Sequence, residues 1–311
     1  MPVYTTATAI GQREDLIDVI YQISPTETPL LSTLARTKAT AVYHEWQTDS
    51  LAAATTANAA VEGADAVSAT ISPTTRLGNY CQIVQKAIQI SGTMEAINKA
   101  GRKSEKAYQL SKAAAELKRD METIISANQG RDSASPRKLG AILSWLKTNT
   151  SKGTSGTDPT TIGVSTRSDG ATRTFTETLL RDVIKSCYDS GGNPTMLVMN
   201  SGLKQKFSAF AGVAAQRYMA PGDQPTTIIG AAEIYMGDFG QISIVPDRFM
   251  RTRDALLIDP EYMALSYLRP FQTNDLAKTG DSEKTQLLCE FTLEMRNEAA
   301  SAIVADLNPA L

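Results

Sequence analysis

The stretch SEKAYQLSKAAAELKRDMETIISANQ, residues 104–129, is the longest amphipathic segment of this sequence. Steps of three and four residues place its apolar or small side chains on one stripe of an α-helix: Ala107, Leu110, Ala114, Leu117, Met121, Ile124 and Asn128. Ser104 is the expected N-cap, and Gly130 is the expected left-handed residue after the C-terminus. At about 1.5 Å per residue, the helix would span about 39 Å, well beyond the average helix of a globular domain. A rod of this length with one narrow apolar stripe suits a strut laid across a flat surface.

An ordinary surface helix of an α/β enzyme is the other interpretation, and the rest of the chain decides between the two. Helix-like and strand-like segments alternate irregularly along the 311 residues, which indicates an α+β fold of one large domain or two ordinary ones. The net charge of −2 does not fit a dedicated nucleic-acid-binding protein, which needs a basic face. No apolar run reaches membrane-spanning length, and residues 1–11 lack the layout of a signal peptide. We therefore expect folding in the cytoplasm and no membrane partner.

The sequence contains few residues of the types that most often act in catalysis or metal binding. Cys81, Cys187 and Cys289 are too far apart for a metal-binding spacing, and we interpret them as buried free thiols. His44 is the only histidine, which removes most familiar enzyme designs at neutral pH without excluding an enzyme. It lies in a strand-like alternation, where a cross-strand packing residue is expected. We expect no cofactor and no metal.

The first 38 residues predict an arm. A Thr-rich lead and a short helical patch precede SPTETPLL (24–31), where Pro25 and Pro29 bar both a helix and a central strand. An arm without its own core lies against another surface, either its own domain or a neighbouring subunit.

Residues 39–91 predict a long β-hairpin. Its limbs, AVYHEWQTDSL (41–51) and NYCQIVQKAIQIS (79–91), are rich in β-forming residues. The segment between them is rich in small residues and nearly devoid of large apolar ones, so it cannot bury enough surface to fold alone. Loops of this length are uncommon inside compact domains, and we expect a neighbour to order this one.

A compact α/β lobe follows from residue 174. Thr174 and Glu177 fit a capping box, and SGGNP (190–194) ends the helix that they begin. The expected buried face of that helix comprises Leu179, Leu180, Val183, Ile184 and Cys187. TMLVM (195–199), QISIVP (241–246) and ALLID (255–259) predict strands, and a second helix carries Leu203, Phe207 and Phe210. The preceding Gly/Ser/Thr-rich run within 147–170 lacks the residue order of a phosphate-binding loop, and we interpret it as a surface loop only.

The clearest strand is TQLLCEFTLEMRN (285–297). Its two sets of alternate residues predict a half-buried antiparallel strand with one face on a core. MALSYLRPFQ (263–272) and SAIVAD (301–306) predict strands before and after it. We expect this sheet to carry the long helix.

Three sequence segments, together with the order of the elements, resemble those of a known family. They are EWQTDSLAAA (45–54), GNYCQIVQKAIQISGT (78–93) and DPEYMALSYLRPFQTNDLAKTGDSEKTQLLCEFTLEMRNEAA (259–300). The chain resembles the major capsid proteins of tailed bacteriophages, which share the Hong Kong 97 (HK97) fold. The resemblance covers nearly the whole chain and is loosest at 147–170.

The resemblance implies a structural subunit, not an enzyme, that forms the icosahedral or elongated head around a double-stranded DNA genome. It implies an N-terminal arm (1–38), an extended loop (39–92), a spine helix with the first part of a peripheral domain (93–170), an axial domain (171–258) and a returning peripheral sheet (259–311). Expected partners are copies of itself in hexamers and pentamers, separate scaffolding, portal and decoration proteins, and weakly held DNA. The expected location is the virion, assembled in the host cytoplasm. Interface residues expected on the extended loop are Glu45, Trp46, Asp49, Glu62, Asp65 and Arg76, and those expected to pack the spine helix are Leu110, Leu117, Met121 and Ile124.

Two alternatives stay open. One is another head component, such as a decoration or head-closure protein. The other is a carboxylate-based hydrolase using Asp247 with Asp254, or Glu294 with Glu298, although paired carboxylates are usually a solvated face. Some shells of this fold form isopeptide bonds from a lysine of the extended loop. Residues 39–85 contain no lysine, so we expect a shell held non-covalently.

Overall fold

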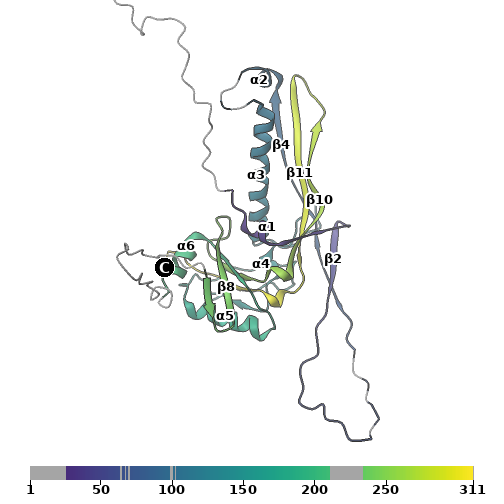
Figure 1. Ribbon diagram of the computed structural model, residues 1–311, viewed down its shortest axis with the longest axis vertical. Coiled ribbons are helices and arrows are strands. Elements are labelled where there is room, and N and C mark those ends of the chain that lie inside the picture. Colours follow the sequence, from purple (N-terminus) through teal and green to yellow (C-terminus); the bar gives the residue numbers. More distant parts are fainter. Residues whose placement is uncertain are drawn as a thin grey trace, which may run out of the picture.

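The computed structural model describes residues 26–63, 65, 66, 68, 71–98, 101, 103–210 and 234–310. Three sheets are present, of four, six and two strands. Figure 1 shows an elongated molecule in which a long helix runs beside long strands toward one end, while a hairpin points toward the other. The helical patch predicted near residues 13–20 lies outside the described residues.

The long helix is α3, Glu105–Ser126. The Ser104 side chain accepts a hydrogen bond from the Ala107 N–H, which confirms the predicted N-cap. The C-terminus differs from the prediction, because the helix ends at Ser126 with Ala127 as its C-cap, before Gly130.

The buried stripe of α3 is rotated slightly from the predicted one. Leu117 and Met121 are buried as predicted, and Ala113 and Ile125 continue their row at steps of four. Leu110, Ala114 and Ile124 are partly buried at the edge of the same core. Glu122, a charged residue outside the predicted stripe, is also fully buried.

A four-stranded sheet carries α3, as predicted. Its order is β1 (Ala35–Lys38), β10 (Met263–Leu276), β11 (Ser282–Met295) and β4 (Gln82–Ser91), and only β1 pairs in parallel. The prediction of one buried face on β11 is wrong for the half from Leu287 to Met295, which is buried on both faces. One face packs with α3, and on the other face Glu294 lies 3.3 Å from the side chain of His44 at the root of the hairpin.

The hairpin is shorter than predicted. β2 (Tyr43–Thr48) pairs with β3 (Thr75–Tyr80) in a two-stranded sheet of their own. Residues 82–91, expected in the second limb, form β4 and pair with β11. The alternating pattern of 79–91 therefore spans two strands in two different sheets, separated at Cys81.

The predicted lobe is built on a six-stranded sheet. Its order is β5 (Thr150–Ser151), β12 (Ala302–Val304), β9 (Ala255–Ile258), β6 (Met196–Met199), β8 (Gly240–Pro246) and β7 (Ile234–Gly237). Helices α5 (Glu177–Asp189) and α6 (Ser201–Ser208) share a core with one face of it. Thr176 caps α5 through the Leu179 N–H, so the predicted capping box beginning at Thr174 is wrong. The strand predicted at 301–306 joins this sheet and not the long one.

The two sheets share one core. Met196, Val198, Leu256 and Ile258, on the other face of the six-stranded sheet, pack in the same cluster as the buried stripe of α3. The short helix α4 (Ile142–Trp145) is fully buried in this cluster. Short helical segments α2 (Gly92–Ala96), η2 (Pro260–Tyr262) and η3 (Glu298–Ala300) connect the other elements.

The last part of the predicted arm belongs to the subunit's own core. The expectation that Pro29 bars a helix is wrong, because Pro29 begins α1 (Pro29–Thr33), where the missing N–H of proline costs no hydrogen bond. Leu30 and Leu31 of α1, together with Leu34, are buried, and β1 extends the long sheet. All three cysteines are buried free thiols, as predicted. Among the described residues, no helix combines the length and the apolar character needed to span a bilayer.

Candidate assembly surfaces

The tip of the hairpin offers surface without any core of its own. Every described residue from Asp49 to Arg76 is exposed, and the described residues between the two strands form no further strand. Three large apolar side chains stand out along it: Leu51, Val61 and Ile71 are 99%, 78% and 91% exposed. Apolar side chains held in water on a small-residue loop are the kind of surface that becomes buried in an interface.

Charged residues of the hairpin divide into a paired set and an unpaired set. The guanidinium group of Arg76 donates from Nε and Nη2 to the two carboxylate oxygens of Glu45. Arg76 Nε lies 2.7 Å from Glu45 Oε1. Arg76 lowers the pKa of Glu45 mainly through the hydrogen bond. Asp49, Glu62 and Asp65 are exposed and make no ion pair with any described residue. The loop thus presents unpaired acidic groups that another surface could neutralise.

Trp46 differs from the rest of the predicted interface set. It is partly buried, and its ring lies 5.4 Å from that of Trp145 in the core. Trp46 therefore packs against its own chain. The interface role of Glu45, Asp49, Glu62, Asp65 and Arg76 stays a prediction.

Ion pairs hold α3 to the long sheet at two places along the helix. Near the N-terminus of α3, Lys106 lies 3.1 Å from Asp275 of β10 and 3.4 Å from Glu283 of β11. Farther along, Lys86 of β4 lies 3.0 Å from Glu116 and 3.2 Å from Asp120. The core side chains Leu117, Met121 and Ile125 lie on the same half of the helix as Glu116 and Asp120. On this half of α3, polar pairs therefore lie beside the apolar packing.

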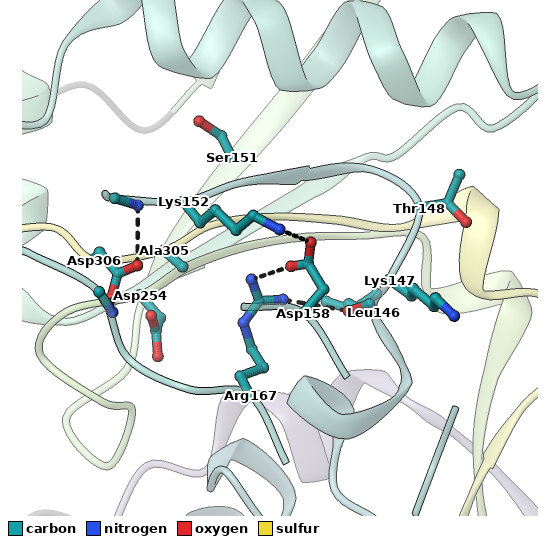
Figure 2. A network of polar contacts seen from close by, with 12 residues as sticks. Leu146, Lys147, Thr148, Ser151, Lys152, Asp158, Arg167, Asp254, Ala305 and Asp306 are labelled. Atoms are coloured by element: carbon teal, nitrogen blue, oxygen red, sulfur yellow. Dashed lines mark hydrogen bonds and ion pairs between the residues drawn. The ribbon is translucent and has the colours of Figure 1, made fainter. Parts of the chain in front are cut away.

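The segment 147–170, interpreted from sequence as a surface loop only, contains a buried polar network. Figure 2 shows Lys152 and Arg167 converging on the carboxylate of Asp158. The Arg167 side chain is 3% exposed and also donates to the Leu146 carbonyl at 3.2 Å. These bonds fold the loop back on itself.

Asp306 fastens the same loop to the six-stranded sheet. Its carboxylate accepts the N–H groups of Gly153 (3.0 Å) and Gly170 (2.8 Å) and pairs with Arg253 at 2.7 Å. Burial by itself would raise the pKa of Asp306. These bonds lower the pKa by a larger amount, so the net pKa lies below the usual value. This anchor could not be predicted from the sequence, because its members lie in three distant segments.

Three of the four carboxylates considered for hydrolysis, Asp247, Asp254 and Glu294, are buried. Asp247 and Asp254 are 1% exposed, so the expected solvated face is wrong for them. Burial raises the pKa of Asp254 to about 6, and Arg251 opposes that shift. Glu294 binds Arg296, whereas Glu298 accepts from the Thr148 backbone and hydroxyl. Glu294 and Glu298 thus bind different groups and do not form the carboxylate pair considered for hydrolysis. Among the described residues, no group of three or more metal-binding side chains comes together.

Comparison with protein-family models matches residues 3–308, nearly the whole chain, to the SU10 major capsid protein family. The chain belongs to this family. Its function is accordingly that of a phage major capsid protein, a structural subunit of the shell, as the resemblance in the sequence indicated.

Individual relatives agree with this assignment. The major capsid protein of Escherichia phage Phieco32 is 24% identical, and the match covers 94% of each chain. The capsid asymmetric unit of cyanophage A-1(L) is similar with a TM-score of 0.69 at 11% identity, covering 97% of this chain and 98% of the other. The capsid of a native GTA particle gives a TM-score of 0.64 at 12% identity and 97% of both chains. The fold is therefore HK97-like, as predicted.

Proposed function

We propose that the subunit assembles with copies of itself into hexamers and pentamers that close an icosahedral or elongated head. The head would enclose the double-stranded DNA of a tailed phage. The observation that carries this proposal is the hairpin, whose exposed tip has no core in its own chain and projects along the long axis of the molecule (Figure 1). A tip that exposes apolar and acidic groups gains stability only by contact with another surface.

Within this proposal the structural parts have separate roles. The hairpin and its loop correspond to the extended loop, α3 to the spine, and the long sheet to the peripheral domain. The lobe on the six-stranded sheet corresponds to the axial domain. The arm would contact a neighbour through residues before Pro29, since α1 and β1 are already part of the subunit's own core.

The remaining partners follow from the same role. Assembly would take place in the host cytoplasm, with scaffolding, portal and decoration proteins as separate chains, and the product would be the virion. DNA would be held weakly, because a net charge of −2 provides no strongly basic lining. No catalytic activity is proposed, since Asp247, Asp254 and Glu294 are buried and the carboxylate of Glu298 accepts hydrogen bonds from Thr148.

Electron microscopy of the purified full-length protein tests the proposal. We expect closed shells or hexameric and pentameric capsomers. Deleting residues 52–71 should leave a subunit folded by circular dichroism but abolish or distort the shells. The matched control replaces Arg181 with alanine, which removes an exposed ion pair with Asp238 on the lobe, remote from the hairpin. Shells of normal size from the deletion variant would show that the hairpin tip is not an assembly element.

A further inference from the structure

The charges of the spine helix α3 are divided unequally between its two sides. The helix carries as many acidic as basic residues, so its side chains have no net charge: Glu105, Lys106, Lys112, Glu116, Lys118, Arg119, Asp120 and Glu122. Figure 1 shows α3 running beside the strands of the long sheet, so the helix has one side toward the sheet and one side away from it. The contacts of each charged residue show to which side it belongs.

All four acidic side chains of α3 are engaged within the subunit. Glu116 and Asp120 share Lys86 of β4, at 3.0 Å and 3.2 Å. Glu105 is buried and accepts a hydrogen bond from the glutamine side chain one turn later, at 2.7 Å. Glu122 is buried and accepts two backbone N–H groups of α1. The acidic residues are therefore used at the sheet or in the interior.

Three of the four basic side chains are not used in this way. Lys106 reaches the carboxylates of β10 and β11, whereas Lys112, Lys118 and Arg119 form no ion pair with any described residue. Lys112 and Lys118 are exposed, and Arg119 is partly exposed. At about 100° per residue, Lys112 and Arg119 point in nearly the same direction, away from the buried Leu117, and they lie about 10.5 Å apart along the helix axis.

We call Lys112, Lys118 and Arg119 the cationic face of α3. Ser111 and Ala115 lie between them on the helix surface, and Ser111 is exposed. Both side chains are small and uncharged, so another molecule can approach the helix closely there. A helix with no net charge thus presents only positive charge on its outer side.

The opposite face of the long sheet has a different character. Because the Lys86 side chain reaches α3, the alternate residues Gln85 and Gln89 lie on the face turned away from the helix. Gln286 of β11 donates to Gln85 on that face. Lys284 lies there as well, and its Nζ donates to a threonine hydroxyl of the turn between β10 and β11 at 2.7 Å. One face of this part of the subunit is therefore rich in neutral amides, and the other carries the cationic face of α3.

We propose that the cationic face of α3 binds the phosphate backbone of DNA, and that this side of the subunit therefore lines the inside of the shell. The surface of a single helix is convex, so it cannot enclose a small ligand as a pocket does. It can lie along an extended polyanion. Phosphates recur about every 3.4 Å along the axis on each strand of duplex DNA, so the spacing of Lys112 and Arg119 corresponds to about three of them. Lysine and arginine bind phosphates without reading the base sequence.

The strength of such binding fits a shell that holds its genome loosely. Three phosphate contacts give one subunit a weak affinity that falls steeply with salt. Many copies arranged around the same DNA add their contacts, so the wall can hold the DNA while each single contact exchanges readily. The inference rests on the proposed function only in that the packaged genome is the DNA that is bound.

Binding is tested with the unassembled full-length subunit and a short fluorescently labelled DNA duplex. Fluorescence anisotropy gives the binding constant at salt concentrations from 10 to 100 mM. Lys112→Gln combined with Arg119→Gln removes two phosphate contacts. The slope of the logarithm of the binding constant against the logarithm of the salt concentration should become shallower by about 1.8, and the affinity at 10 mM salt should fall on the order of 1,000-fold.

Two further variants separate charge at this face from charge in general. Lys112→Arg combined with Arg119→Lys keeps both charges and should keep the slope of the unchanged chain. Lys185→Gln combined with Lys284→Gln removes the same charge from the lobe and from the opposite face of the long sheet, and should also leave the slope unchanged. Circular dichroism and thermal midpoints check that every variant is folded.

An unchanged slope in the variant that lacks Lys112 and Arg119 would overturn the proposal. An equal loss of binding in the Lys185 and Lys284 control would do the same, because net charge alone would then be responsible. Binding of poly-glutamate but not of the duplex would also overturn it, since the partner would be an acidic polypeptide.

The orientation is tested in DNA-filled particles. A photo-crosslinker attached through Ser111→Cys should label the DNA, and the same group attached through Ala87→Cys should not. Both positions are exposed, Ala87 lies on the opposite face of the long sheet, and the native cysteines are buried. Labelling from Ala87→Cys alone would show that the cationic face points outward. Failure to form shells would instead count against the proposed function and leave the binding measurement in solution unchanged.

Discussion

Replacing Glu122 with glutamine changes the contact between the spine helix and the last part of the arm. The buried carboxylate of Glu122 accepts the N–H groups of Leu30 at 2.7 Å and Leu31 at 2.9 Å. Burial raises its pKa from 4.5 to about 7, the two backbone hydrogen bonds oppose this shift, and Asp247 adds to it. A difference of this size between folded and unfolded chains corresponds to about 3 kcal/mol.

The sign follows from proton binding. Between pH 4.5 and about 7 the folded subunit holds a proton on Glu122 that the unfolded chain has released. The contribution of this group to stability is therefore fully present below about pH 4.5 and is lost as the pH rises through about 7. Glutamine does not titrate. The free energy of unfolding of the unchanged chain minus that of Glu122→Gln should fall by about 3 kcal/mol over this range.

Urea unfolding of unassembled subunits at a series of pH values from 4 to 8 measures this difference. Glu116→Gln is the matched control on the same helix. Lys86 lowers the pKa of Glu116 below its usual value of 4.5, mainly through its hydrogen bond. The corresponding difference for Glu116→Gln should therefore rise with pH only at the acid end of the series and stay flat above the usual pKa. A flat difference for Glu122→Gln, or one that rises with pH, would refute the reasoning.

Three other results are expected. Leu117→Asp should prevent folding, because Leu117 is 1% exposed and even truncation of such a residue to alanine costs about 2–5 kcal/mol. The control Lys118→Ala, on the exposed face, should have little effect. Soluble Leu117→Asp protein that still assembles would contradict burial of the stripe. Removing residues 1–24 should weaken assembly more than monomer stability, and equal thermal midpoints of shells with and without them would count against an intersubunit arm. Mature particles boiled with detergent and reductant should run as one band near 33.4 kDa, because residues 39–85 contain no lysine; a ladder of multimers would disprove a non-covalent shell.

Features that depend on neighbours in the sequence could be predicted. The N-cap at Ser104 and the position of the spine helix follow from contacts within four residues along the chain. The strands β6, β8, β9 and β11 follow from composition and alternation, and the exposed hairpin tip follows from a lack of large apolar residues.

Strand partners and buried polar groups could not be predicted in this way. The pattern of 79–91 reads as one strand, yet its first residues pair with β2 and the rest with β11, more than a hundred residues away in the sequence. Glu122 resembles any other charge on the outer face of α3 until α1 packs over it and offers two N–H groups. Asp306 and His44 likewise gain their roles from segments that meet only in the folded chain. Local periodicity decides which residues can share a face, so the spine helix, the strands β6, β8, β9 and β11 and the coreless loop could be recognised along the chain. Which face meets which partner depends on contacts between residues that are distant along the chain, so that choice is made only when the chain folds.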